Sequence, residues 1–113
     1  YRVPSGSQEF LSLERIVQTA RAVGGDDHHF KVVQLPVNLA MTEAFTNANQ
    51  TVNGKKATLL EAAAEYGVTV MASGSILQSK LSAGLPPIVD EAFPGLRTDA
   101  QRALQFVRST PGV

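Results

Sequence analysis

Apolar residues recur at helical spacing near the start of the chain. The stretch SLERIVQTARAV, residues 12–23, predicts an amphipathic helix. The positions expected on its buried stripe are Leu13, Ile16, Val17, Ala20 and Val23. Ser12 is placed to cap the start of this helix, and Gly24 to supply the left-handed conformation that ends it.

Two short valine-rich runs predict buried strands. FKVVQLPV, residues 30–37, follows the polar segment GGDDHH, and Pro36 predicts that regular pairing ends near it. The second predicted strand is 68–72, which follows Gly67 and precedes a loop of small residues.

Two capping boxes predict the remaining long helices. Thr58 followed by Glu61 opens the first, which we expect to end at Gly67, and Thr98 followed by Gln101 opens the second. The residues expected to be buried on these helices are Leu59, Leu60, Ala63, Ala64, Ala100, Ala103, Leu104 and Val107. The segment 38–56 is expected to be an excursion with a hairpin turn at Asn53-Gly54, outside the core. Residues 74–97 are expected to be mostly loop, with a short helix over 88–93.

The predicted order is helix, strand, helix, strand, helix in one α/β segment that spans residues 1–113. Strands separated by helices favour parallel pairing through right-handed crossovers. Two strands leave two open edges, and parallel strands normally have neighbours and are covered on both faces. We therefore expect either that the missing strands belong to a longer parent chain or that other copies supply them by self-association.

Composition narrows the possible classes of protein. The formal net charge is zero, from 10 basic and 10 acidic residues, which gives no attraction to nucleic acid or to an anionic membrane. The chain has no cysteine, which excludes disulfides and thiolate chemistry. It has neither a run of apolar residues long enough to span a bilayer nor the pattern of a signal peptide. We expect a cytoplasmic protein without nucleic-acid or membrane partners.

Three long stretches resemble the C-terminal half of an aldo/keto reductase of the bacterial aldo/keto-reductase-like type. They are SLERIVQTARAVGGDDHHFKVVQLPVNLAMTEAF, TLLEAAAEYGVTVMAS and FPGLRTDAQRALQFVRSTPGV. The resemblance implies part of a (β/α)8 TIM barrel, from just after its fifth strand to just before its eighth. It therefore implies a complementing barrel segment as the partner that would supply the missing strands. It also implies a parent enzyme that transfers hydride from NADPH or NADH to a carbonyl. The segments that would select the carbonyl substrate and distinguish the two cofactors are expected outside this chain.

The same resemblance implies five cofactor-binding positions in this chain. Gln34 matches the strand glutamine that binds the nicotinamide carboxamide, although a polar side chain satisfied inside the barrel is the alternative. Ser73, Gly74, Ser75 and Ile76 match the loop that approaches the pyrophosphate. Ser73 stands where the family has an aromatic ring that stacks on the nicotinamide, so we expect this chain alone not to hold the cofactor tightly.

The family's catalytic tetrad of Asp, Tyr, Lys and His belongs to the half of the barrel that this chain does not match. We expect no catalytic residue here; in particular, Tyr66 is expected to pack at a helix end. Residues 26–29, Asp-Asp-His-His, contain metal-ligand types, but four consecutive side chains diverge, and we expect a polar turn and no metal site. Two functions stay open: an inactive fragment of a reductase, or a small non-enzymatic assembly or interaction module of the same fold.

Overall fold

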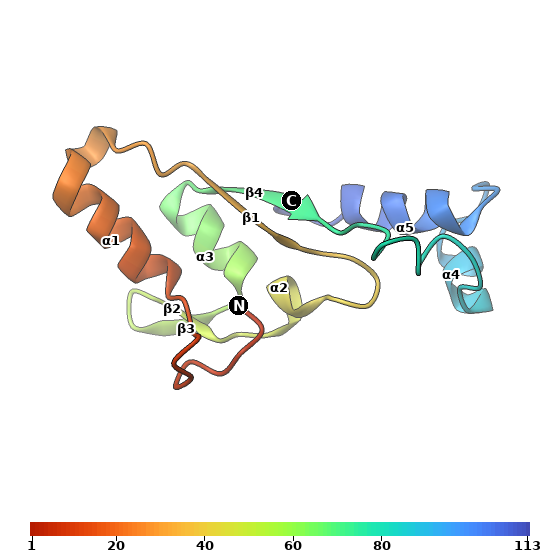
Figure 1. Ribbon diagram of the computed structural model, residues 1–113, viewed down its shortest axis with the longest axis horizontal. Coiled ribbons are helices and arrows are strands. Elements are labelled where there is room, and N and C mark those ends of the chain that lie inside the picture. The colour runs from red at the N-terminus through yellow and green to blue at the C-terminus, as the bar shows by residue number, and fades with distance from the viewer.

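The computed structural model describes all residues, 1–113, and consists of helices around a two-stranded parallel sheet with a small hairpin beside them (Figure 1). The helices are α1 (Leu13–Gly24), the 3-10 turn η1 (Gly25–Asp27), α2 (Glu43–Thr46), α3 (Leu59–Tyr66), α4 (Pro87–Ala92) and α5 (Asp99–Arg108). The strands are β1 (Val32–Pro36), β2 (Gln50–Val52), β3 (Lys55–Ala57) and β4 (Thr69–Ser73). The five expected elements and the short helix near 88–93 are present, while α2 was not predicted.

Helix α1 follows its sequence signals at the start and departs from them at the end. The Ser12 hydroxyl accepts a hydrogen bond from the amide of Arg15, as an N-cap should. The left-handed stop is Gly25, with φ of 68°, so the prediction of Gly24 is wrong by one residue. Val23 is 87% exposed, which also contradicts the predicted stripe, because no element covers the last turn of the helix.

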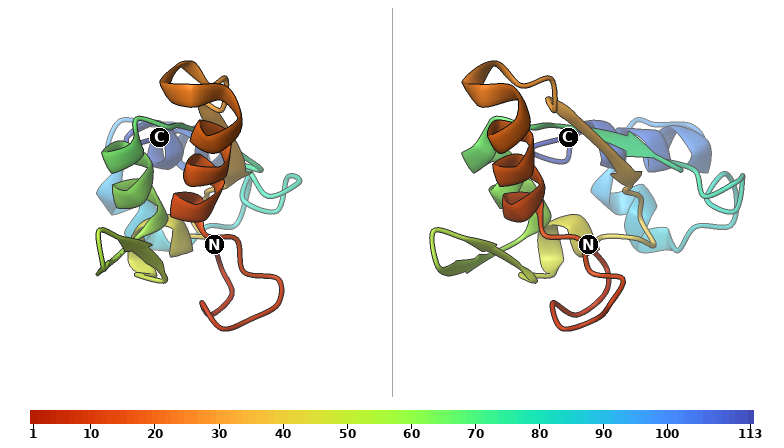
Figure 2. Two further views of the ribbon diagram at one scale, coloured as in Figure 1. Left: turned by 90° about the vertical axis from the view of Figure 1, so that its left-hand side faces the viewer. Right: turned by 60° about the vertical axis from the view of Figure 1, so that its left-hand side comes forward.

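Strands β1 and β4 pair in parallel from Val32 beside Thr69 to Pro36 beside Ser73. Helix α3 forms part of the crossover between them and lies next to α1 on one face of the sheet (Figures 1 and 2). Alternate side chains of the two strands therefore enter one core with α1 and α3. The sheet residues in or against this core are Val33, Leu35, Val37, Val68, Val70 and Ala72.

Helix α3 is bounded as the sequence predicts. The Thr58 hydroxyl accepts from the amide of Glu61, and the Glu61 carboxylate accepts from the amide of Thr58. This backbone hydrogen bond lowers the pKa of the Glu61 carboxyl. Gly67 ends the helix with φ of 64°. Ala62 is buried and Ala64 is exposed, so the buried stripe differs from the prediction at Ala64.

The connection 38–57 is more deeply packed than its sequence suggests. The hairpin turn at Asn53-Gly54 is confirmed, with φ of 50° and 77°. Gln50, however, is only 1% exposed, and its side chain accepts from the amide of Leu13 and donates to the carbonyl of Leu11. The expectation that residues 38–56 lie outside the core was therefore wrong for Gln50, which fixes the entry to α1, and for Ala44, which is fully buried in the core.

Helices α4 and α5 project from one end of the molecule (Figure 1). Arg102 of α5 forms ion pairs with Asp90 of α4 and with Asp99, and it donates to the carbonyl of Leu96. The capping box of Thr98 and Gln101 is confirmed. Leu104 is 52% exposed and not buried as predicted, because no further layer covers that face of α5.

The molecule is more open than a compact monomer of its size. Its accessible surface is 7166 Å², whereas a compact protein of 12.0 kDa exposes roughly 6,000 Å². Its radius of gyration is 16.1 Å, against about 13 Å for a compact chain of this length. The fold is a mixed α/β arrangement. Its two parallel strands form no closed barrel, so the partial barrel expected from the sequence stays a prediction. None of the helices combines the length and the apolar character needed to cross a lipid bilayer.

Two identical substitutions on α1 test where its core face lies. Val17→Ala removes a side chain that is 1% exposed and should lower the free energy of unfolding by about 2 kcal/mol. Val23→Ala is the matched control, and the higher helix propensity of alanine should leave stability unchanged or raised by a few tenths. Urea unfolding followed by circular dichroism measures both. Equal effects of the two substitutions would contradict the assignment of the core face.

Candidate functional site

The carboxyl ends of β1 and β4 lie next to each other at one end of the sheet, which we call the carboxyl edge. It differs from the unpaired sides of the two strands. Pro36 and Ser73 are paired in register, and the amide of Val37 donates to the carbonyl of Ser73 (3.2 Å). Both strands then turn into connections, at Asn38 and at Gly74. Ligand sites of parallel α/β sheets lie at this edge, beyond the carboxyl ends of the strands.

Asn38 joins the two connections at this edge. It is fully buried, its Nδ2 donates to the carbonyl of Gly74 (2.9 Å), and its Oδ1 accepts from the amide of Ala40 (3.0 Å). Gly74 has φ of 61°, a conformation that favours glycine. Sequence reasoning missed Asn38, and the only signal was an asparagine directly after a predicted strand, where such side chains commonly bond to nearby backbone.

Gln34 lies on the face of the sheet that no helix covers. Its register partner is Met71, which is 55% exposed, and Val32 on the same face is 48% exposed. The Gln34 side chain is exposed and forms no hydrogen bond within the chain. Side-chain alternation places Ser73 on this face as well, two residues beyond Met71. The structure therefore brings the predicted residues Gln34 and Ser73 to one uncovered surface.

The loop after β4 has an unusual backbone. Leu77, Gln78 and Ser79 have φ of 46°, 51° and 71°, so three consecutive residues other than glycine are left-handed. Each such residue costs of order 1 kcal/mol or more, and such strain clusters at ligand clamps. Hydrogen bonds from Leu77 to the carbonyl of Gly74 and from Leu81 to the carbonyl of Ile76 hold the loop in this shape.

Several backbone amides of this loop have no partner within the chain. Those of Ser75, Ile76, Gln78 and Ser79 donate to no protein group, and the Ser75 hydroxyl forms no hydrogen bond. Lys80 is exposed just beyond them. Clustered amides and a nearby cation are the groups that bind an anion in a loop of this kind. The predicted residues Ser75 and Ile76 belong to this set, whereas Gly74 contributes a carbonyl to the scaffold.

The two tyrosines hold their protons more tightly than a free tyrosine does. Burial raises the pKa of the Tyr1 hydroxyl, the carboxylate of Glu43 raises it further, and Arg2 only partly opposes them. Tyr1 donates to the carbonyl of Pro36. Burial and a hydrogen bond to the Glu14 carboxylate raise the pKa of the Tyr66 hydroxyl. This hydrogen bond (3.0 Å) also connects α3 to α1. Both hydroxyls thus donate to groups of the chain itself, Tyr1 to Pro36 and Tyr66 to Glu14.

The segment 26–29 does not gather its metal-ligand side chains. Asp26 and Asp27 are exposed in the turn η1, while His28 is 8% exposed and its Nδ1 has no hydrogen-bond partner. No group of three or more His, Asp or Glu side chains in the structure is close enough to hold a metal ion. The candidate site is therefore the carboxyl edge of β1 and β4.

A substitution at Asn38 tests what holds this edge together. Asn38→Ala should lower stability by about 1–3 kcal/mol, because the Gly74 carbonyl and the Ala40 amide lose their buried partner. The matched control is Asn47→Ala, since the Asn47 side chain forms no hydrogen bond. Urea unfolding gives the change in stability, and amide shifts of residues 74–82 report the loop. An unchanged loop spectrum in Asn38→Ala would contradict the role assigned to Asn38.

Comparison with known proteins does not identify a relative. No family model, no curated protein and no solved structure matches this chain. The geometry of the carboxyl edge is therefore the basis for a proposed function.

Proposed function

We propose that this chain supplies part of the dinucleotide cradle of an aldo/keto-reductase-like (β/α)8 barrel. The observation that carries the proposal is the alignment of the two parallel strands. Gln34 lies in the middle of β1, next to the strand from which the loop 73–76 leaves at the carboxyl edge. The parent enzyme would transfer hydride from NADPH or NADH to a carbonyl group. The chain alone would be inactive.

The uncovered face of the sheet suits the nicotinamide end of the cofactor. A glutamine side chain offers one acceptor and two donors, which match the amide of the nicotinamide ring. Gln34 is exposed and has no partner within the chain, so its side chain is free to bind without breaking an existing contact. In a complete barrel this face would be turned to the lumen and the ring would be shielded from water.

The loop after β4 suits the pyrophosphate. The free amides of Ser75 and Ile76, and those of Gln78 and Ser79 beyond them, are donors without partners. Lys80 adds a positive charge in the same loop. The left-handed residues 77–79 support the proposal, because strained backbone is common in loops that bind ligands.

The same geometry explains why binding by this chain alone should be weak. Ser73 cannot stack on a nicotinamide ring as an aromatic side chain does. No element covers the face of the sheet that carries Gln34 and Met71, so water competes for every hydrogen bond that a ligand would form there. Both tyrosine hydroxyls already donate to groups of the chain, Tyr1 to Pro36 and Tyr66 to Glu14.

Titration with NADPH tests this proposal. We expect no saturable change in nicotinamide fluorescence below about 1 mM. At millimolar concentration we expect shifts in the amide spectrum confined to Gln34 and residues 73–80. Gln34→Ala should weaken these shifts about fivefold, since one hydrogen bond is lost, whereas Gln18→Ala on the exposed face of α1 should not. Shifts spread evenly over the chain, or micromolar affinity, would contradict the proposal.

The openness of the molecule favours a second function, as a non-enzymatic assembly module. The excess of accessible surface over a compact monomer is about 1,200 Å², which exceeds the roughly 800 Å² that one partner buries in a standard interface. Neither β1 nor β4 contains a charged residue that would discourage pairing at its edge. A net charge of zero also removes long-range repulsion between copies.

Sedimentation tests the assembly function. At micromolar concentration the chain should sediment as a dimer or larger species. Ala72→Pro should shift it toward the monomer, because the register turns the Ala72 amide to the outer edge of β4, where proline removes only that donor. A well-folded monomer of the unaltered chain would contradict the assembly function and leave the cradle proposal untouched.

A further inference from the structure

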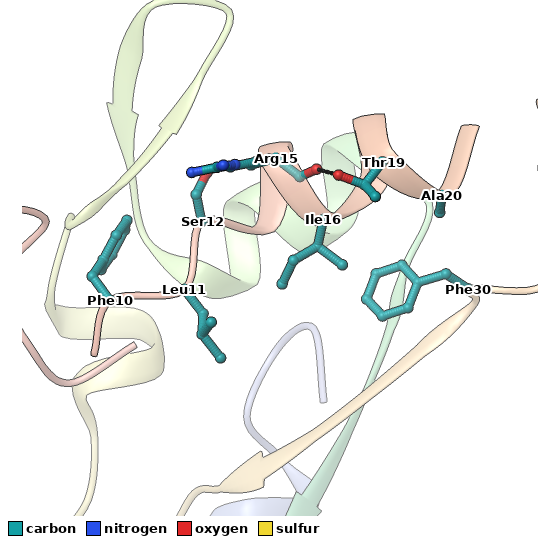
Figure 3. Close-up of a pocket in the computed structure, with 8 residues that line it drawn as sticks. All are labelled: Phe10, Leu11, Ser12, Arg15, Ile16, Thr19, Ala20 and Phe30. Carbon is teal, nitrogen blue, oxygen red and sulfur yellow. Dashed lines mark hydrogen bonds between the residues drawn. The ribbon is translucent and has the colours of Figure 1, made fainter. Parts of the chain in front are cut away.

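An apolar groove runs along the edge of β1 that is not paired with β4. Its outer part has a volume of about 460 Å³ and lies between α1 and Phe30. Phe10, Leu11, Ile16 and Ala20 form its apolar wall, and Ser12, Arg15 and Thr19 of α1 and its N-cap form a polar rim. Figure 3 shows Leu11, Ile16 and Phe30 pointing into this space. Its inner part, about 160 Å³, continues beside β1 and shares Leu11 and Ile16 with the outer part.

The edge of β1 in this groove presents unpaired backbone groups. The amide of Thr69 donates to the carbonyl of Lys31, and the amide of Val37 donates to Ser73. In a parallel pair, alternate residues face the neighbouring strand, so the amides and carbonyls of Val32 and Gln34 face the groove. The edge ends at Pro36, which has no amide and whose carbonyl accepts from Tyr1.

We propose that this groove binds an extended, uncharged segment of a separate polypeptide, which adds to the sheet as a strand beside β1. The two donors and two acceptors of Val32 and Gln34 match the backbone of a strand, and few other ligands would satisfy all four. Alternate side chains of the added strand would enter the groove between α1 and β1, and the others would face solvent.

The lining of the groove specifies the side chains. The inner part is walled by Tyr1, Leu13, Val33, Leu35 and Leu59. Gln34 borders it through its backbone, since the Gln34 side chain lies on the opposite face of the sheet. A charged side chain there would lose its hydration without gaining a partner. An apolar cavity of roughly 150 Å³ holds a benzene-sized group, so the inner part, at about 160 Å³, fits one ring or branched aliphatic side chain.

A single strand fits this place better than the β1 edge of a second copy. Leu13 and Ile16 of α1 line the inner part, so α1 lies along the groove. A second copy that paired through its own β1 would bring its own α1 into the same space. A strand advances about 3.3 Å per residue, so a segment of about six residues would cover the groove from Phe30 to Pro36. Self-association is then left to the outer edge of β4.

The test uses a capped peptide of about six residues that alternates threonine with valine, phenylalanine and valine. Hydrogen exchange measured by NMR should slow about tenfold at the amides of Val32 and Gln34 at roughly 1 mM peptide. The amides of Val70 and Ala72, which face the outer edge of β4, should not change. The same peptide N-methylated at alternate amides is the control, and it should not protect, because it cannot complete the strand.

Two substitutions of equally exposed residues locate the groove. Leu11→Glu places a charge in its wall and should weaken peptide binding about tenfold, whereas Ile88→Glu on α4 should not. The two side chains are 67% and 66% exposed, so neither change should unfold the chain.

The proposal fails if Val32 and Gln34 gain no protection, if Val70 and Ala72 gain as much, or if the methylated peptide binds equally well. It also fails if dilution without peptide speeds exchange at Val32 and Gln34, since a second copy would then occupy the edge.

The proposal concerns the chain outside a closed barrel, because in the barrel of the proposed function the open side of β1 would pair with the preceding strand of the parent. It does not depend on the dinucleotide, because the peptide experiment contains none and the groove lies at the open side of β1, not at its carboxyl end. A failed NADPH titration would leave it standing, and a failed peptide titration would leave the cradle standing.

Discussion

The parallel pairing of β1 with β4 is the contact on which the other features depend. It places Pro36 level with Ser73, and so determines that the connections at Asn38 and Gly74 leave the sheet at the same edge. The alternation along both strands then assigns every second side chain to the core with α1 and α3 and turns the others to an uncovered face. A shift of one residue in this register would exchange the two sets and bury Gln34 in place of Leu35.

Local signals in the sequence predicted most of the elements, because those signals act over a few residues. Both capping boxes, the hairpin turn at Asn53-Gly54 and the stop at Gly67 are present as predicted. The errors concern burial, which depends on what covers a face. Val23 and Leu104 fit a helical stripe, yet they are exposed because no layer lies over them. Gln50 and Asn38 are buried because their side chains bond to distant backbone, which periodicity does not reveal.

The candidate site divides in the same way. The predicted strand order already placed Gln34 and the loop 73–76 on neighbouring parallel strands. The free amides of Ser75 and Ile76 and the left-handed residues 77–79 did not follow from it, because none of residues 77–79 is a glycine and their residue types do not indicate positive φ. Asn38 escaped notice for a related reason, since its role is to join two connections that are distant in the sequence.

Gln34 links the two proposals physically. Its side chain lies on the uncovered face, where a nicotinamide would bind, and its backbone amide and carbonyl face the groove, where a strand would add. An edge strand whose alternate backbone groups lack partners is less restrained than a central one. Adding a neighbour beside β1 would restrain the backbone of Gln34 and so reduce the entropy that its side chain loses on binding a ligand. The openness that would make this chain a weak binder alone would therefore also let a partner strand strengthen the proposed cradle.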